Sequence, residues 1–297
     1  MRVLVTGRAG QVGAEVVQAL QGFAEVIAHD RSTLDLADPA QVAARVREAR
    51  PDAIVNAAAY TAVDQAETDA EAARRVNATG PGVLAEEAKR TGALLIHYST
   101  DYVFDGTKAA PYVETDATNP LGTYGRTKLE GERAIAASGC DHLILRTSWV
   151  YGPHGRNFLL TMLRLGAQRE ELRIVDDQRG APTSSAQLGR LTRALLEREP
   201  ALREKGGVYH ATAAGETTWR RFAEAIFAGA ARRAGPAFRT PRVVPITTAE
   251  YPTPARRPAN SVLDNARLEQ AFGVRLGDWR EGLDEALSAL PLGSARR

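Results

Sequence analysis

The amino terminus constrains the fold of this chain more than any other segment. A short β-branched run, Arg2–Thr6, leads directly into Gly7-Arg8-Ala9-Gly10-Gln11-Val12-Gly13, and an amphipathic segment follows at 11–20. Glycines between a buried strand and a helix form a turn whose backbone can approach a phosphate group. The amino terminus of the helix adds free N–H groups and a partial positive charge. The sequence therefore predicts a strand–turn–helix unit that binds phosphate.

A second strand is predicted at residues 25–28, and it ends at His29-Asp30-Arg31. Asp30 lies 20 residues after Gly10, at about the distance where an acidic side chain holds the ribose hydroxyls of a bound dinucleotide. Arg31, in contrast, could receive a 2′-phosphate. The two neighbours favour different cofactors, so the sequence predicts a nicotinamide dinucleotide and leaves NADH and NADPH both open.

Strand and helix patterns alternate up to about residue 150. Further strands are predicted at 53–56, 94–98 and 142–146, with helices at 39–49, 69–77, 82–90 and 124–137. This alternation predicts an α/β fold, namely a Rossmann-like doubly wound parallel sheet with helices on both faces. Ligands of such sheets bind beyond the carboxyl ends of the strands, where the motifs above also fall.

The alternation weakens after residue 150. Short strands are predicted at 172–175 and 207–210 and helices at 190–198 and 219–232, while five prolines between 239 and 260 exclude a long helix there. We expect a smaller α/β substrate domain, interleaved with the first and closing over it. The predicted dinucleotide-binding domain spans 1–150 and about 183–206, and the predicted substrate domain spans 151–182 and 207–297.

Composition excludes several classes of function. The 38 basic and 36 acidic residues nearly balance, and no basic stripe interleaved with aromatics indicates nucleic-acid binding. No apolar run approaches the 18 or so residues that span a membrane. The first predicted strand starts at residue 2 and leaves no room for a secretory signal, and the single cysteine, Cys140, suits a reducing compartment. We therefore expect a cytoplasmic protein with neither a nucleic-acid nor a membrane partner.

Tyr124 and Lys128 stand four residues apart in Tyr124-Gly125-Arg126-Thr127-Lys128. On a helix this spacing places both side chains on one face. An ammonium within about 4–6 Å lowers the pKa of a phenol by roughly 1–3 units, so the pair could exchange a proton with a carbonyl or an alcohol. The same spacing is common on solvated helix faces, and it is the glycine turn upstream that favours the catalytic interpretation.

Two other segments follow predicted strands. Asn56-Ala57-Ala58-Ala59 offers small side chains against which a dinucleotide can lie. Ser99-Thr100-Asp101 offers the Thr100 hydroxyl, which can donate a hydrogen bond to a substrate carbonyl oxygen or can bond the backbone of a turn.

The spacing Gly-x-x-Gly-x-x-Gly, together with Tyr-x-x-x-Lys, resembles the extended short-chain dehydrogenase/reductase superfamily. Within it, the chain resembles the dTDP-4-dehydrorhamnose reductase family from Val3 to about Asp264. The resemblance rests on separate blocks in the same order, at 56–64, 99–106, 124–128, 145–152, 157–158, 176–183 and 252–261.

The resemblance implies roles for individual residues. Thr100, Tyr124 and Lys128 match the catalytic positions. The implied cofactor contacts are Gly7, Gly10, Gln11, Val12, Asp30, Ala57, Ala58, Ala59 and Lys128, to which the charge argument adds Arg31. The implied sugar-nucleotide contacts are Thr61, Val63, Tyr102 and Trp149, beside Thr100 and Tyr124. Trp149 could equally be a core aromatic. Arg256 or Arg257, with Asn260, could meet the substrate pyrophosphate, and an exposed surface pair of arginines is the alternative.

The same family has been described with a magnesium ion that glutamates hold at a dimer contact. Glu15 matches one such position, but Ser184-Ser185-Ala186-Gln187 lacks the expected glutamate. We therefore expect no metal, and a homodimer stays open.

The resemblance implies NADH- or NADPH-dependent reduction of the C4 ketone of a dTDP-linked 4-keto-6-deoxy sugar. One alternative is another extended sugar-nucleotide epimerase or dehydratase, although a dehydratase needs extra acid and base groups beside the threonine and no Asp-Glu pair follows Thr100. A second alternative is a non-catalytic, cofactor-binding regulatory subunit of methionine adenosyltransferase. The intact set of Thr100, Tyr124 and Lys128 disfavours this last interpretation.

Overall fold

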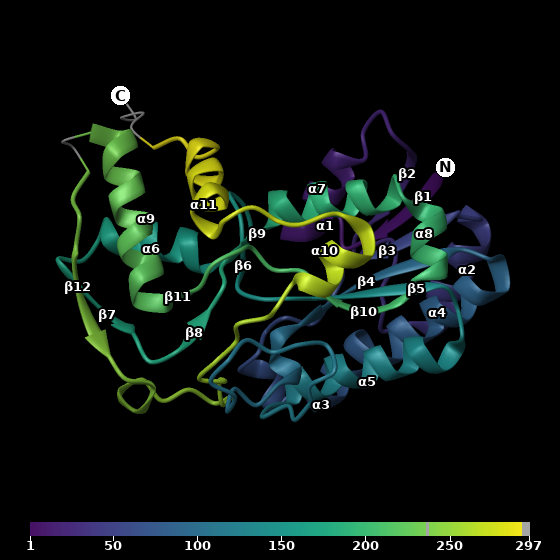
Figure 1. Ribbon diagram of the computed structural model, residues 1–297, viewed down its shortest axis with the longest axis horizontal. Helices are drawn as coiled ribbons and strands as arrows, with labels where there is room; N and C mark the ends of the chain where they lie inside the picture. The colour runs from purple at the N-terminus through teal and green to yellow at the C-terminus, as the bar shows by residue number, and fades with distance from the viewer. Residues whose placement is uncertain (236–237, 293–297) are drawn as a thin grey trace.

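A six-stranded parallel sheet forms the centre of the larger of two lobes (Figure 1). The computed structural model describes residues 1–235 and 238–292. The strand order is β10-β5-β4-β3-β1-β2. The strands are β1 (Arg2–Thr6), β2 (Glu25–His29), β3 (Ala53–Asn56), β4 (Leu94–Thr100), β5 (His142–Thr147) and β10 (Gly207–His210). The chain runs outward from β1 to β2 and then crosses to β3 on the other side, so a topological switch point lies between β1 and β3.

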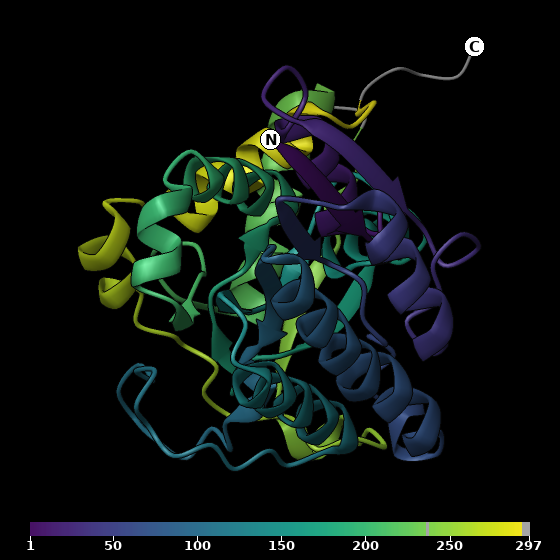
Figure 2. The ribbon, with the colours of Figure 1, turned by 90° about the vertical axis from the view of Figure 1, so that its right-hand side faces the viewer.

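Helices cover both faces of this sheet, as the sequence predicts (Figure 2). Alternate strand residues point to opposite faces: Val3 and Val5 pack against one set of helices and Leu4 against the other. The first face carries α1 (Gln11–Ala19), α7 (Ser185–Leu196), α8 (Glu199–Glu204) and α10 (Ala266–Phe272). The second carries α2 (Pro39–Ala49), α4 (Gly80–Thr91) and α5 (Thr123–Ser138). The Rossmann-like fold class is confirmed.

Cap residues explain where several helices begin and end. Asp38 accepts hydrogen bonds from two backbone N–H groups at the start of α2, and Pro39 occupies the first turn. Gly139 ends α5 in the left-handed conformation that glycine adopts at low cost. The helix predicted at 69–77 is instead α3 (Ala70–Arg74) followed by a π-helical turn at Arg75–Thr79, a local widening that often marks functional sites.

A smaller lobe lies to the left in Figure 1, around a separate apolar core. Its helices are α6 (Phe158–Gly166), α9 (Trp219–Ala234) and α11 (Trp279–Ser288). Its strands form three pairs: β7 (Glu171–Val175) with β12 (Arg242–Ile246), β6 (Val150–Tyr151) with β9 (Thr183–Ser184), and β8 (Arg179–Gly180) with β11 (Thr217–Thr218). Strand β12 lies in the proline-rich region, which holds no long helix.

Strand β10 and helix α10 fall within 207–297, the range predicted for the substrate domain, yet they belong to the larger lobe. Gly207–His210 pairs with β5, and Leu268 of α10 packs in the core beneath the sheet. The division into two domains stays a prediction. Of the described residues, none forms a helix long and apolar enough to cross a bilayer.

Candidate active site at the sheet switch point

The glycine turn is shaped by close backbone contacts. Gly7 has a φ of +76°, and a Cβ there would lie 2.8 Å from the backbone nitrogen of Ala58. A Cβ on Gly13 would lie 2.1 Å from the Gly7 carbonyl oxygen. Gly10 precedes α1 without any side-chain cap, so the first N–H groups of the helix point out of the turn unsatisfied by a side chain. This arrangement fits a pyrophosphate.

Asp30 follows β2, where the ribose of a dinucleotide would lie. Its Oδ1 accepts from the backbone N–H and the hydroxyl of Ser32, and its Oδ2 accepts from Arg8 Nε at 3.0 Å. These hydrogen bonds, those of Ser32 above all, lower the pKa of Asp30 to about 2. Arg31 extends outward and pairs with Asp35 at 3.3 Å. Arg8, which the sequence did not single out, is therefore the cation nearest this carboxylate.

The alanines after β3 lie directly against the glycine turn, since the Ala58 backbone is what a Cβ on Gly7 would strike. Tyr60, the residue after these alanines, is fixed by Asn77 of the π-helical turn. Asn77 Oδ1 accepts from Tyr60 N at 2.8 Å, and Asn77 Nδ2 donates to Tyr60 O at 3.1 Å. Thr61 is exposed and Val63 half-buried beyond this clamp.

Thr100 ends β4 and is buried. Its hydroxyl donates to Asp101 Oδ1 at 2.9 Å and accepts from the backbone N–H of Tyr102 at 3.2 Å. Burial raises the pKa of Asp101 to about 6. The rings of Tyr102 and Tyr124 meet edge to face, with centroids 5.8 Å apart. Thr100 and Tyr124 are brought together at this end of β4.

Tyr124 lies in the first turn of α5. Glu67 caps this turn by accepting from the Thr123 backbone N–H at 2.7 Å. A Cβ on Gly125 would lie 2.1 Å from the Tyr102 carbonyl oxygen, so the glycine lets α5 approach closely. Burial raises the pKa of Tyr124 to about 12, and the hydrogen bond with Thr100 opposes this effect only in part.

Lys128, one turn later on α5, is 1% exposed. Its Nζ donates to the Tyr98 carbonyl oxygen at 2.7 Å and lies 3.0 Å from His97 Nε2. Burial lowers the pKa of Lys128 to about 8. The prediction that Lys128 lowers the pKa of Tyr124 is wrong for this structure, because burial dominates at the phenol and the Lys128 amine is engaged by β4.

Trp149 faces the smaller lobe. It is a non-glycine residue with a φ of +48°, a strained conformation that often accompanies function. Its ring stacks on Trp219 with centroids 3.6 Å apart, and a Cβ on Gly180 would lie 2.5 Å from it. The half-buried Trp149 thus packs against Trp219 and Gly180 of the smaller lobe.

Arg257 pairs with Asp64 through two hydrogen bonds, at 3.0 and 2.9 Å, and these lower the pKa of Asp64. Asn260 is buried and uses both amide hydrogens on the carbonyl oxygens of Lys108 and Ala110. Asn260 therefore holds a loop, whereas Arg257 keeps its guanidinium half-buried. Arg256 is exposed.

Gln11 and Val12 begin α1. Gln11 Oε1 accepts from Asn157 Nδ2 at 2.8 Å, which ties the glycine turn to the start of α6. Val12 packs against the core beneath the sheet. The side chain of Gln11 therefore joins the two lobes, a contact that its position next to Gly10 in the sequence did not reveal.

Two basic side chains lie near Glu15. Its carboxylate lies 3.6 Å from His154 Nε2, and the nearby Arg190 makes a bidentate pair with Glu285 at 2.6 and 2.7 Å. Within 1–235 and 238–292, no three His, Cys, Asp or Glu side chains group as metal ligands.

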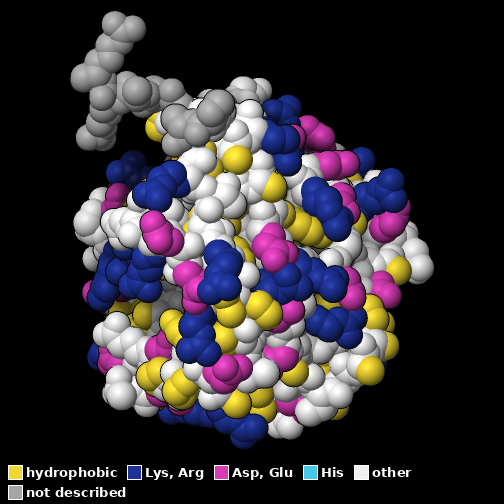
Figure 3. Space-filling view, turned by 90° about the vertical axis from the view of Figure 1, so that its left-hand side faces the viewer, with side chains coloured by type: hydrophobic (Ala, Val, Ile, Leu, Met, Phe, Trp, Pro, Cys, Tyr) yellow, Lys and Arg dark blue, Asp and Glu magenta, His cyan; other side chains and the backbone are white. Residues whose placement is uncertain are grey.

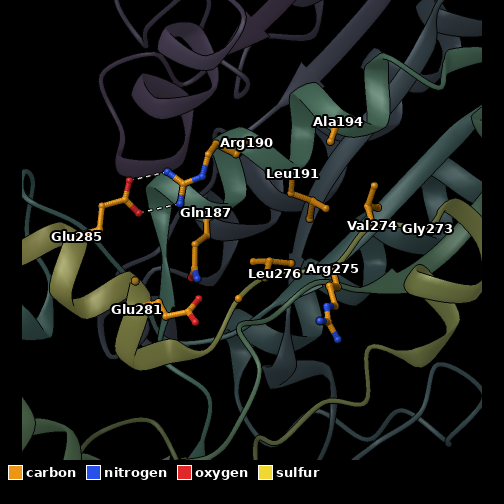
Figure 4. A pocket seen from close by; sticks show the side chains of 12 residues that line it. Gln187, Arg190, Leu191, Ala194, Gly273, Val274, Arg275, Leu276, Glu281 and Glu285 are labelled. Carbon is orange, nitrogen blue, oxygen red and sulfur yellow. Dashed lines mark hydrogen bonds and ion pairs between the residues drawn. The ribbon is translucent and has the colours of Figure 1, made fainter.

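A cavity of about 460 Å³ opens between α7, residues 273–277 and α11 (Figure 4). Gln187 and Glu281 project into it, and the Arg190–Glu285 pair borders it. None of the predicted site residues lines this cavity, so it is separate from the switch point described above.

Comparison with known proteins gives consistent results. The family model described as RmlD substrate binding domain matches residues 1–291. A dTDP-4-dehydrorhamnose reductase from Burkholderia thailandensis is 51% identical over 287 residues, covering 94% of this chain and 96% of the relative. A crystal structure of the Clostridium acetobutylicum reductase has a TM-score of 0.90 and 39% identity, covering 97% of this chain and 99% of that one. The Bacillus anthracis reductase in complex with NADP has a TM-score of 0.90 and 35% identity, covering 97% and 98%.

Proposed function

We propose that this chain, which belongs to the dTDP-4-dehydrorhamnose reductase family, reduces the C4 ketone of dTDP-4-dehydro-L-rhamnose to dTDP-L-rhamnose with NADPH or NADH. The observation that carries the proposal is the contact of the half-buried Tyr124 with the buried Thr100 at the carboxyl end of β4. The glycine turn, which opens at the same edge of the sheet, supplies the cofactor site.

When bound, the nicotinamide supplies a hydride to the C4 carbon. As charge develops on the ketone oxygen, Tyr124 donates its phenolic proton to that oxygen. The raised pKa of about 12 keeps Tyr124 protonated and ready to donate at neutral pH. Thr100 can turn its hydroxyl from Asp101 to the same oxygen and stabilise the charge.

Four further sets of groups position the reactants. In its protonated form Lys128 holds the ribose next to the nicotinamide, and the ends of β1 and β3 hold the pyrophosphate and adenosine. Trp149, Thr61, Val63 and Tyr102 border the sugar, and Arg257 can leave Asp64 for the substrate pyrophosphate, to which its planar fork is suited. The smaller lobe is proposed to carry the sugar nucleotide.

Replacing Tyr124 by Phe tests the assignment. We expect kcat to fall by roughly 10²–10⁴ because the general acid is lost. Tyr209→Phe is the matched control, since Tyr209 is a buried tyrosine whose hydroxyl donates to Lys205 O, outside the site. Oxidation of NADPH is followed by absorbance at a saturating concentration of the keto sugar, and the product is identified by NMR. Near-normal turnover by Tyr124→Phe would exclude this role.

The alternatives give different outcomes in the same assay. An epimerase converts the sugar without net consumption of NADPH, whereas a reductase consumes one cofactor for each ketone reduced. A regulatory subunit binds NADPH and oxidises none. The intact Thr100, Tyr124 and Lys128 favour the reductase.

We further propose a cytoplasmic location, supported by the single, buried and unpaired Cys140. Charges of both signs are interspersed on the face of the smaller lobe in Figure 3, which gives no support to nucleic-acid binding. A homodimer is the assembly that the family resemblance implies, and sedimentation equilibrium of the purified chain tests it.

A further inference from the structure

Four buried polar side chains form a row through the centre of the larger lobe. Thr6, Asn56 and His97 are register partners on β1, β3 and β4, and Lys128 on α5 continues the row. Each is at most 1% exposed. The successive contacts are Thr6 Oγ1 to Asn56 Oδ1 at 2.6 Å, Asn56 Nδ2 to His97 Nδ1 at 2.9 Å, and His97 Nε2 to Lys128 Nζ at 3.0 Å. The row links the residue before the glycine turn to the amine beside Tyr124.

The orientation of Asn56 fixes the direction of these hydrogen bonds. Its Oδ1 accepts from the Thr6 hydroxyl and also faces the backbone N–H of Ala58 at 3.3 Å. A backbone N–H can only donate, so the oxygen belongs on that side and the amide NH₂ faces His97. His97 Nδ1 then accepts, and the ring carries its hydrogen on Nε2.

His97 stays neutral in this position, because complete burial and the nearby Lys128 hold its pKa well below the usual value. The Nε2–H of a neutral ring therefore points at Lys128 Nζ. This contact is a hydrogen bond when Lys128 is an amine with a free lone pair. An ammonium at the same place would set two N–H groups against each other.

We propose that His97, with its tautomer fixed by Asn56, is a positioning residue that opposes protonation of Lys128 and so sets the pH range in which Lys128 can hold the cofactor. Protonation of Lys128 requires the His97 hydrogen to move from Nε2 to Nδ1 and the Asn56 amide to turn. The turn takes the Asn56 oxygen away from the Ala58 N–H, which costs a buried hydrogen bond. This inference rests on the proposed reductase function.

The charged and titratable groups around Lys128 do not replace this control. On α5, Tyr124 precedes it by one turn, and Glu132 follows by one turn and slightly favours the ammonium. Glu132 is already paired with Arg146 of β5 at 2.7 Å. On β4, Tyr98 offers only its carbonyl oxygen to the amine. Among these neighbours, His97 is the side chain in direct contact with Nζ.

The ammonium is the form that binds the ribose, so NADPH affinity should fall as the pH rises through the pKa of Lys128, about 8. Asn56→Asp should reverse the tautomer, because a carboxylate accepts from Nδ1–H and leaves Nε2 to accept from the ammonium. His97→Gln can present its amide oxygen to Lys128. Both variants should move the alkaline limb of NADPH binding upward by about one pH unit.

The test measures the NADPH dissociation constant by fluorescence between about pH 6 and 10, for the full-length wild type and each variant. His210→Gln is the matched control, since His210 is an equally buried histidine on β10 that contacts Asp264 O and none of the row. Its limb should coincide with that of the wild type. Identical limbs in Asn56→Asp, His97→Gln and wild type would overturn the proposal and leave His97 a structural residue.

Nitrogen NMR of histidine-labelled protein without cofactor supplies a readout that needs no catalysis. At a pH above the pKa of Lys128, about 8, the His97 signal, assigned by its loss in His97→Gln, should show a protonated Nε2 in the wild type and a protonated Nδ1 in Asn56→Asp. A wild type with hydrogen on Nδ1 at alkaline pH would overturn the inference. Failure of the reductase assay alone would overturn the proposed function and leave this result unaffected.

Discussion

The two halves of the site are built differently. On the sheet side, Thr6, Asn56, His97 and Lys128 are buried and bonded to one another. On the sugar-nucleotide side, Arg257 and Asp64 form a pair whose side chains are 22% and 42% exposed. A buried polar network is costly to disturb, whereas a half-exposed pair exchanges partners easily. From this difference we infer that the sheet-side half, where the cofactor is proposed to bind, is preformed, and we propose that the half around Arg257 rearranges when a sugar nucleotide binds.

The largest expected effect concerns the stability of the preformed half. Glu132 on α5 pairs with Arg146 on β5, and both side chains are about 5% exposed or less. Glu132→Gln removes one partner and leaves a buried guanidinium without its counter-charge. We expect the free energy of unfolding to fall by about 3–5 kcal/mol, measured by urea denaturation with circular dichroism.

Glu130→Gln is the matched control on the same helix. Glu130 pairs with Arg74, but their side chains are 37% and 57% exposed, so the loss of stability should be much smaller than in Glu132→Gln. Equal losses in the two variants would contradict the claim that the sheet side depends on its buried polar network.

The sequence predicted where the elements of the preformed half lie, but it did not predict the contacts between their side chains. The strand at 2–6 and the three glycines predict the turn because local spacing alone determines a strand–turn–helix unit. The structure brings Thr100, at the end of β4, into contact with Tyr124, in the first turn of α5. Their roles in catalysis stay predictions.

The row from Thr6 to Lys128 could not be predicted, because it depends on the register between strands. His97 reads as one residue inside an apolar strand, and only its alignment with Asn56 on β3 gives it a partner. Polar residues inside otherwise apolar strands are the available signal. Arg8 was missed for a similar reason, since it meets Asp30 only once β1 and β2 are paired.

An intermediate effect is expected on the substrate side. Arg257→Ala should lower kcat/KM for the keto sugar by about 10–100-fold, mostly through KM, because a charged hydrogen bond to the pyrophosphate contributes about 1.5–3 kcal/mol. Steady-state kinetics at saturating NADPH measure it. Arg256→Ala is the control: Arg256 is its exposed neighbour and should change kcat/KM little.

A fall in kcat with unchanged KM in Arg257→Ala would show that this half acts in the chemical step, and the contrast between the halves would fail. Asp64→Asn sharpens the test. It weakens the pair that holds Arg257 at Asp64, while the hydrogen bonds of Arg257 to Thr253 Oγ1 and the Ala255 carbonyl oxygen remain. We expect KM to fall, whereas a purely structural pair would raise KM in both variants.

The smallest effect is expected at the rim of the preformed half, where Arg8 and Asp30 lie. The side chain of Arg8 is 53% exposed and that of Asp30 is 22% exposed, so solvent screens their pair and it contributes little to stability. Because Arg8 is the cation nearest the ribose position, Arg8→Ala should lower kcat/KM for NADPH by less than about tenfold and that for NADH hardly at all. The ratio of the two constants is the measurement, and Arg31→Ala is the control.

Asp30, with a pKa of about 2, stays ionised from pH 5 upward, so the ratio should not change with pH through Asp30. A larger change for Arg31→Ala than for Arg8→Ala would return the 2′-phosphate to Arg31 and place cofactor discrimination on the exposed loop after β2.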